Sequence, residues 1–283
     1  MPDLLANILH FKSSRKAIVA ISIVIALSGC GNFEHRGKTD SAPPYPVDVS
    51  KVPNAVPRVE PFSRYGNPKH YRVGRKNYYV LESNKGYRER GIASWYGTKF
   101  HGRRTSSGEP YDMFAMTAAH KTLPLPTYAS VTNIRNGKSV IVKINDRGPF
   151  KHNRLIDLSY AAAAKLGITD TGTGLVEITA IDAEKYRNTL NRPIIKKKMH
   201  DSDSLDANIY LQVGAFSERN NAEKLLWRLR KKALKNSKIV ATHTDNKPVY
   251  RVQIGPMKNA KHADQIAAKL AKLGIKDSHV VIN

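Results

Sequence analysis

The clearest hydrophobic pattern in the chain is a repeat near its C-terminus. Residues 212–216 (QVGAF) are echoed 41 positions later by residues 253–257 (QIGPM). A segment with apolar residues at i, i+3, i+4 and i+7 follows each copy, as in a helix with one apolar face. These residues are Ala222, Leu225, Leu226 and Leu229, then Ala263, Ile266, Ala267 and Leu270. β-type runs at residues 239–242 and 279–282 complete the units. The pattern predicts a βαβ-βαβ domain over residues 207–283, with four strands and both helices on one face.

The middle of the chain, residues 91–183, shows a different pattern of short β-type runs between turn signals. The runs cover residues 91–96, 129–134, 139–144 and 175–181. Asn136-Gly137 separates two of them, which is a strong signal for a β-hairpin. A single helix is predicted over residues 160–166, with its stop at Gly167. Short strands with one inserted helix indicate a compact β-barrel.

The segments outside these two domains lack such periodicity. Residues 30–70 are polar and interrupted by prolines, so we expect an extended tether there. Residues 71–90 are rich in tyrosine and form a short lead-in to the barrel. Residues 184–206 carry a run of three lysines and are predicted to be a second linker.

The N-terminus has the form of a secretory signal over residues 1–29. Basic residues precede an apolar run at residues 17–27, which is too short to span a bilayer comfortably. The run ends in Leu-Ser-Gly before Cys30, the only cysteine of the chain, and this resembles a bacterial lipobox. The resemblance implies lipidation of Cys30, and Gly31 after it favours the outer membrane. The alternative is a signal anchor with a chance cysteine.

Composition narrows the function classes. Lys and Arg number 47 against 23 Asp and Glu, a formal charge of +24, which indicates anionic surroundings. A single cysteine excludes an internal disulfide framework and a cysteine-rich zinc site. No apolar run after the N-terminus reaches the roughly 18 residues of a membrane-spanning helix, which excludes a polytopic membrane protein. Export also argues against a nucleic-acid partner.

The C-terminal repeat has two readings of different class. An open sheet with aromatic residues is how some domains bind RNA. Residues 209–216 and 250–257, however, resemble the SPOR domain, which implies binding of septal peptidoglycan strands stripped of stem peptides. Because side chains alternate along a strand, Tyr210 and Gln212 share a face, and Arg251 and Gln253 share the matching one. We expect these four residues to line the glycan groove; the alternative is that the glutamines are ordinary solvated sheet residues.

The central domain resembles the rare lipoprotein A family. The motifs that carry the resemblance are GIASWYG (91–97), FHGR (100–103), TAAHKTLP (117–124), NDRGPF (145–150) and IDLS (156–159). The resemblance implies a mostly β fold, a double-psi β-barrel, followed by the α+β SPOR domain. It further implies an endolytic lytic transglycosylase that acts on peptide-free glycan in septal wall remodelling and daughter-cell separation.

Such a reaction restricts the catalytic groups. In lytic transglycosylation the sugar's own C6 hydroxyl attacks C1, so no cofactor, metal or enzyme nucleophile is needed. The enzyme supplies a carboxylic acid that protonates the leaving oxygen and then acts as a base, and this acid needs a raised pKa. The candidate residues, which the family resemblance supports, are Asp157, Asp112, Glu109, His120 and Asp146. As proton donor we rank Asp157 before Asp112 and Glu109, with Asp146 and His120 orienting the acid or the sugar.

Each candidate also has a plain structural alternative. Glu109 and Asp112 lie in a glycine- and proline-containing loop that solvent could cover, and His120 follows two alanines as a core histidine would. Asp146 could cap the turn before Arg-Gly-Pro, and Asp157 could cap the following helix. Taken together, the sequence predicts an outer-membrane lipoprotein that faces the periplasm at the division septum and binds denuded glycan strands. The alternatives are a non-catalytic wall-binding or wall-loosening lipoprotein and a glycan hydrolase.

Overall fold

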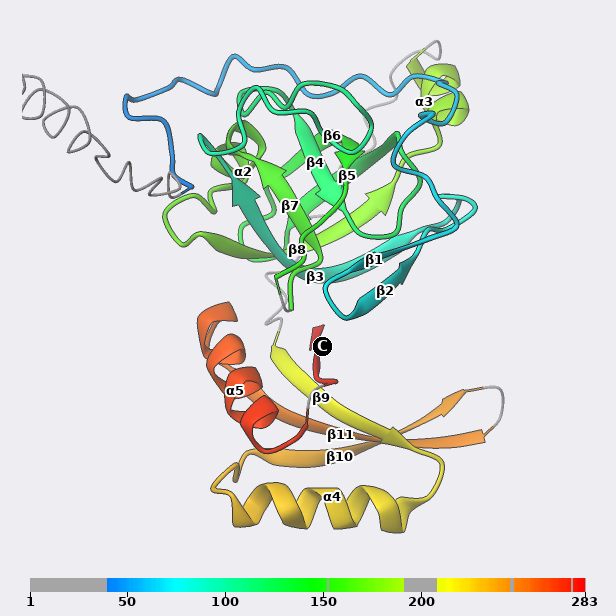
Figure 1. Cartoon of the computed structure of the whole chain (residues 1–283), viewed down its shortest axis with the longest axis vertical. Coiled ribbons are helices and arrows are strands. Elements are labelled where there is room, and N and C mark those ends of the chain that lie inside the picture. The colour runs from blue at the N-terminus through cyan, green and yellow to red at the C-terminus, as the bar shows by residue number, and fades with distance from the viewer. Residues whose placement is uncertain (1–39, 152, 191–207, 245–246, 276, 283) are drawn as a thin grey trace, which may run out of the picture. The chain divides into compact units, whose positions relative to one another are not determined.

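The computed structural model describes residues 40–151, 153–190, 208–244, 247–275 and 277–282. The expected signal segment, Cys30 and most of the second linker lie outside these ranges. Within them, no helix is both long and apolar enough to cross a membrane. The described residues form a barrel with its flanking segments and a C-terminal sheet with two helices (Figure 1).

Between residues 88 and 180, six strands close into a barrel in the order β3-β7-β4-β6-β5-β8 (Figure 1). The strands are β3 (Arg88–Tyr96), β4 (Thr117–His120), β5 (Thr127–Asn133), β6 (Ser139–Asp146), β7 (Ile156–Ser159) and β8 (Thr173–Ala180). The pairs β3–β7 and β4–β6 are parallel, and the other neighbouring pairs are antiparallel. Closure removes the exposed sheet edges, so even four-residue strands are fully paired. The expected double-psi β-barrel is confirmed.

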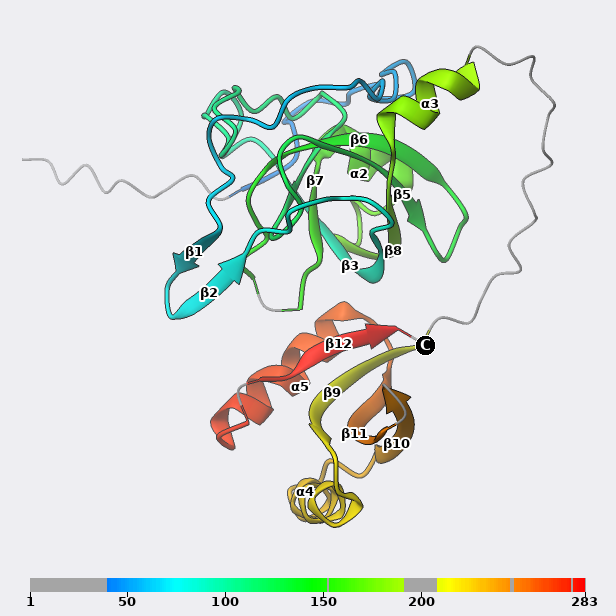
Figure 2. The ribbon, with the colours of Figure 1, turned by 90° about the vertical axis from the view of Figure 1, so that its right-hand side faces the viewer.

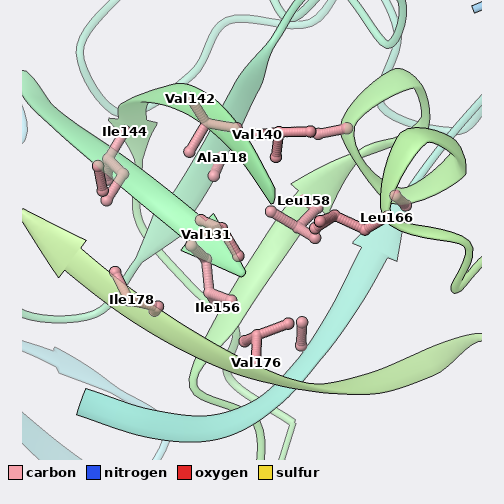
Figure 3. Packing of buried hydrophobic residues seen from close by; sticks show 14 of the residues in the cluster. Ala118, Val131, Val140, Val142, Ile144, Ile156, Leu158, Leu166, Val176 and Ile178 are labelled. Carbon is pink, nitrogen blue, oxygen red and sulfur yellow. The ribbon is translucent and has the colours of Figure 1, made fainter. Parts of the chain in front are cut away.

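The barrel core is built from the inward residues of these strands. Val131, Val142, Ile144, Leu158 and Ile178 are wholly buried and meet in the interior (Figure 3). The predicted hairpin is present: β5 and β6 pair antiparallel on either side of Asn136-Gly137. Gly137 has φ 69°, a left-handed conformation that favours glycine.

Helix α2 (Tyr160–Leu166) follows β7 directly and closes one side of the barrel core. Its N-cap is Ser159, whose side chain accepts a hydrogen bond from the Ala162 N–H at 3.2 Å. Gly167 ends the helix with φ 70° and donates its N–H to carbonyls of the last turn, as the sequence predicts. Because Ser159 caps the helix, the capping alternative for Asp157 is wrong.

Residues 40–67, here called the strap, have no regular secondary structure but lie along the barrel (Figure 1). The Ala55 N–H donates to the Ile141 carbonyl at 3.0 Å, and the Ser63 N–H donates to the Leu125 carbonyl at 2.8 Å. Apolar residues of the strap also pack against the barrel core. Its prolines prevent a helix or strand of its own, so barrel groups satisfy its backbone. The expected tether is therefore held against the barrel from Asp40 onwards.

Two further elements flank the barrel. β1 (His70–Val73) and β2 (Lys76–Tyr79) form a hairpin in the lead-in segment, with Tyr71 and Tyr78 stacked at 5.2 Å between ring centroids. α3 (Ala183–Leu190) follows β8 and occupies the beginning of the expected second linker. That linker is therefore helical at its start.

The C-terminal domain has the predicted βαβ-βαβ order (Figure 2). Its elements are β9 (Ile209–Phe216), α4 (Arg219–Lys231), β10 (Ser237–Thr244), β11 (Lys247–Met257), α5 (Ala260–Lys272) and β12 (His279–Ile282). Over residues 209–282, outside the gaps at 245–246 and 276, four antiparallel strands run in the order β10-β11-β9-β12. Leu211 and Val252 pack against buried residues of both helices, including Leu229 and Leu270. The helices thus share one face of the sheet, as predicted.

Candidate active site

Two of the predicted acids lie at the same level of the barrel, one strand on either side of Ala119. Ala119 of β4 is in register with Asp146 of β6 and with Asp157 of β7. Asp157 is in turn the register partner of Ser94 on β3. Residues directly opposite each other on paired strands project to the same face, so these side chains form one row across four strands. Ala119, whose side chain is a single methyl group, lies between the two aspartates on β4.

Asp157 is more buried than Glu109 or Asp112. The Ser94 hydroxyl donates a hydrogen bond to its Oδ1. Burial raises the pKa of Asp157, although the Ser94 bond and the charges of Lys121 and Arg154 act in the opposite direction. A carboxyl whose pKa is raised by burial keeps its proton to higher pH, as a general acid requires.

Asp146, at the end of β6, is held in a fixed orientation. Its Oδ1 accepts hydrogen bonds from the Ser106 N–H at 2.7 Å, the Ser106 hydroxyl at 2.6 Å and the Arg147 N–H at 2.7 Å. The Arg147 guanidinium reaches away from it, to the carbonyls of Gly66 and Leu123 at 2.8 and 2.5 Å. Asp146 therefore caps a turn, which is the alternative role that the sequence suggested for it. It also lies in the same row of side chains as Asp157.

A pair of tyrosines lies beside this row. The rings of Tyr96 and Tyr111 stack at 4.0 Å between centroids, and the Tyr111 hydroxyl donates to the Tyr96 carbonyl at 2.6 Å. Both pack around Ala119. Burial raises the pKa of both phenols above its usual range, and the charge of Asp157 adds to the shift in each. The tyrosines are therefore neutral groups that exclude water from this end of the barrel.

Glu109 lies in a different setting, on an ion-pair network. The Lys143 Nζ is 2.8 Å from its Oε1 and 3.1 Å from an oxygen of Glu60 on the strap. The Asn145 amide donates to the other Glu109 oxygen at 2.7 Å. Partial burial opposes the shift, but the Asn145 and Lys143 hydrogen bonds lower the pKa of Glu109. Glu109 is thus a carboxylate at neutral pH and suits a charged contact better than a proton donor.

Asp112 is exposed at the loop rim. Its Oδ1 accepts the Phe114 N–H at 2.9 Å and lies 3.7 Å from the Nδ1 of His101. The side chain keeps 55% of its surface exposed. Asp112 is placed to contact a ligand at the rim.

His120 is a buried neutral histidine. Its Nδ1 accepts the N–H groups of Thr122 and Leu123 at 3.2 and 3.0 Å, so the proton belongs on Nε2, which lies 3.0 Å from the Tyr87 hydroxyl. Burial lowers the pKa of His120 to about 3, helped by the charges of Lys121 and Arg147. The ring therefore fixes the turn that follows β4 rather than exchanging protons at neutral pH.

The C-terminal sheet carries a second row of polar residues. Lys238, Gln253, Gln212 and His279 are register partners across β10, β11, β9 and β12. Arg251 donates to the Gln212 Oε1 at 3.4 Å. Among the described residues, the buried Oε1 of Gln253 has no hydrogen-bond partner. A buried acceptor without a partner is costly unless a ligand supplies a donor.

Tyr210 lies on the same sheet face as Gln212, two residues along β9. The Lys238 ammonium lies over its ring, 4.1 Å from the centroid. The four residues predicted to bind glycan, Tyr210, Gln212, Arg251 and Gln253, thus lie on two neighbouring strands, β9 and β11. Their role as glycan contacts stays a prediction.

The sequence missed several neighbours of these sites. The sequence patterns do not mark Ser94, Tyr96 or Tyr111 as site residues, although the first two lie in the GIASWYG motif. Their importance depends on strand register, which neither a motif nor an apolar period specifies. Within the described residues, no group of three His, Cys, Asp or Glu side chains is arranged to hold a metal.

Comparison with known protein families assigns both domains of the chain. A family model described as a lytic transglycolase matches residues 88–178, and one described as a SPOR domain matches residues 206–282. The chain therefore joins a barrel of the lytic transglycolase type to a SPOR domain.

Named relatives match a large part of the chain. A Pseudomonas aeruginosa protein named endolytic peptidoglycan transglycosylase RlpA is 50% identical over 189 residues, which cover 67% of this chain and 54% of that protein. The protein of that name from Neisseria meningitidis serogroup B is 38% identical over 221 residues, 76% of this chain and 84% of the relative. The chain belongs to the RlpA family. It spans about half the length of its Pseudomonas relative.

A solved structure resembles the C-terminal part. The SPOR domain of Pseudomonas aeruginosa RlpA is 25% identical and covers 26% of this chain and 96% of that domain, with a TM-score of 0.25.

Proposed function

We propose that this protein is an endolytic lytic transglycosylase that cleaves the β-1,4 bond between MurNAc and GlcNAc and leaves 1,6-anhydroMurNAc ends. The observation that carries the proposal is the setting of Asp157: a largely buried carboxyl with a raised pKa that accepts a hydrogen bond from the Ser94 hydroxyl. It lies in one row with a second, fixed carboxyl, Asp146. Family membership supports the same activity.

In this mechanism Asp157 begins as the acid and protonates the oxygen of the leaving sugar. The carboxylate that remains then accepts the proton of the C6 hydroxyl as that oxygen attacks C1, so the side chain ends the cycle protonated again. Asp146, fixed on the other side of Ala119, supplies a negative group beside the oxocarbenium-like transition state. Glu109 and Asp112, at the loop, contact the glycan strand, and His120 holds the turn after β4.

The substrate we propose is glycan stripped of stem peptides, bound by the C-terminal sheet. The unpaired Oε1 of Gln253 accepts a sugar hydroxyl, and Gln212 and Arg251 supply further polar contacts on neighbouring strands. Tyr210 offers a ring face against which a sugar can pack. This sheet holds the strand while the barrel cleaves it.

We further propose that the protein is anchored in the outer membrane, facing the periplasm, through lipidated Cys30. Several acyl chains, at roughly 0.8 kcal/mol per buried methylene, suffice for stable anchoring. Recognition of denuded strands by the SPOR domain would then concentrate the enzyme at the division septum.

Mass spectrometry of digested, peptide-free glycan tests the activity directly. Anhydro ends are the expected product. Reducing ends mean that water is the nucleophile and the protein is a hydrolase. No product, with retained glycan binding, means that it is a non-catalytic wall-binding lipoprotein.

A further inference from the structure

The first residues of the strap are bonded to the turn that ends β3. The Asp40 Oδ1 accepts the N–H groups of Gly97 and Lys99 at 3.0 and 3.1 Å, and its Oδ2 accepts the Gly97 N–H at 3.1 Å. Between them, the Thr98 N–H donates to the Ser41 carbonyl at 3.0 Å, and the two hydroxyls meet at 2.8 Å. Three consecutive backbone N–H groups of the barrel are thus satisfied by two residues of the strap.

Gly97 leaves the space that this contact needs. A Cβ built on Gly97 would lie 2.1 Å from the Ser41 carbonyl oxygen, closer than any real Cβ contact. Its φ is not in the left-handed range, so a tight turn does not require glycine here. Any side chain at this position would displace the strap.

The turn held by Asp40 continues directly from the strand that serves the catalytic acid. Ser94, which donates to Asp157, lies three residues before Gly97 on β3. The described groups that act on Asp157 are Ser94 on β3, Lys121 after β4, Arg154 before β7 and Asp40 on the strap. Burial raises the pKa of Asp157, and of the charges acting on it Asp40 alone adds to the rise, while Lys121 and Arg154 oppose it. Asp40 also acts in this direction on neighbouring Tyr111.

We propose that the strap is a working part of the catalytic site, and that Asp40 is a positioning residue that fixes the end of β3, the strand whose Ser94 donates to Asp157. The barrel then reaches full activity only with the strap seated. The catalytic part of this inference rests on the proposed function, whereas the seating of the strap does not.

Seating is measured without turnover, by amide hydrogen exchange of the whole protein. In the parent, slow exchange is expected at Gly97 and Lys99. Gly97→Ala should speed exchange at Thr98 and Lys99 and open the strap to trypsin at its exposed Lys51 and Arg58. Asp40→Asn should speed exchange at Gly97 and Lys99 by at least about tenfold, the equivalent of one lost hydrogen bond. Asp48→Asn is the matched control, because exposed Asp48 accepts the N–H of nearby Ser50 on the same strap.

Catalysis is measured on peptide-free glycan as a function of pH. Asp40→Asn should slow anhydro-product formation roughly tenfold at neutral pH. The rate should recover in part at lower pH, because Asp157 without the Asp40 charge loses its proton at a lower pH. If Asp40 were needed only for folding, Asp40→Asn would lower the rate by the same factor at every pH. The pH at which the rate falls off on the alkaline side would then stay where it is in the parent. Asp48→Asn should leave both the rate and the profile unchanged.

The outcomes separate the two proposals. An active parent whose Asp40→Asn and Gly97→Ala variants keep its rate and pH profile overturns the catalytic role of the strap and leaves the proposed function intact. A parent that forms no product defeats the proposed function and the catalytic role together. Fast exchange at Gly97 and Lys99 in the parent overturns the seating itself.

Discussion

Asp146 and Asp157 are brought to one level of the barrel by a shared neighbour, Ala119. β4 lies between their strands, so the two backbones are about 10 Å apart at this level, twice the usual strand spacing. Their side chains share a face, and Ala119 lies between them on β4. Two carboxylates in unlike surroundings, one buried and one bound by three donors, can take the different roles that glycan cleavage requires.

The first prediction concerns Asp157. The isosteric change Asp157→Asn keeps the shape and can still accept the Ser94 hydrogen bond, but it cannot give up a proton. We expect a loss of anhydro-product formation of about 10²- to 10⁴-fold, while glycan binding by the C-terminal sheet is retained. Product formation is measured by mass spectrometry, with the exposed Asp170→Asn as the control. Full turnover by Asp157→Asn would transfer the role of acid to Asp112 or Glu109.

The same variant carries a stability prediction. The pKa of Asp157 is raised in the fold, so its contribution to stability is present below about pH 4 and is lost as the pH rises through the folded value. Asp157→Asn, which never becomes charged, should therefore unfold at a higher temperature than the parent at neutral pH and at a similar temperature below about pH 4. Thermal melts at the two pH values test this, and a lower melting temperature at neutral pH would contradict burial as the cause of the raised pKa.

His120 should make the fold sensitive to acid. Folding lowers the pKa of His120 from 6.5 to about 3. Between these pH values the side chain binds a proton in the unfolded chain but not in the native chain. Stability should fall as the pH drops from about 6.5 towards 3, by up to about 1.4 kcal/mol per pH unit. His120→Asn keeps an acceptor for the Thr122 and Leu123 N–H groups and should remove this slope. Urea unfolding over that range measures it.

A matched histidine serves as the control for that experiment. His101 also accepts a backbone N–H through its Nδ1, that of Met113 at 3.2 Å, but its side chain is 45% exposed. His101→Asn removes a histidine with the same local hydrogen bond from an exposed site, and its unfolding curves are compared with those of His120→Asn. Equal slopes in His120→Asn and the parent would show that His120 is protonated in the fold.

Gln253 should contribute to glycan binding by the C-terminal sheet. Gln253→Leu removes the unpaired acceptor, and we expect about tenfold weaker binding of peptide-free glycan, the equivalent of one hydrogen bond. Pull-down with denuded sacculi or calorimetry measures it, with Gln265→Leu on the exposed surface of α5 as the control. Equal binding by Gln253→Leu and the parent would show that Gln253 does not contact the glycan.

Cys30→Ala tests the membrane anchor. Without the thiol no acyl chain can be attached, so the variant should be unanchored or retain its signal segment. Membrane fractionation and the intact mass of the protein distinguish these states from the lipidated form. Recovery of the variant in the outer-membrane fraction with the mass of an unmodified chain would rule out lipid anchoring at this residue.

The sequence alone predicted the elements whose apolar period is long enough to be unambiguous. The repeat of residues 212–216 in residues 253–257 gave the order of the C-terminal domain, and Asn136-Gly137 gave the β5–β6 hairpin. The alternation did not predict β4 or β7, because a strand of four residues holds only two periods of alternation. Those two strands carry His120, Ala119 and Asp157.

The sequence determined which residues are chemically able to act: five titratable side chains in or between recognisable motifs, a SPOR-like repeat and a lone cysteine. Only the tertiary structure decided how deeply each of these residues is buried and which groups it contacts. Burial separates Asp157 from Glu109, although both are carboxyls, because desolvation raises the pKa of the first while Asn145 and Lys143 lower that of the second. The strap shows the same limit: its prolines predict an extended chain, but where such a chain lies depends on hydrogen-bonding groups that the barrel presents only once it has folded.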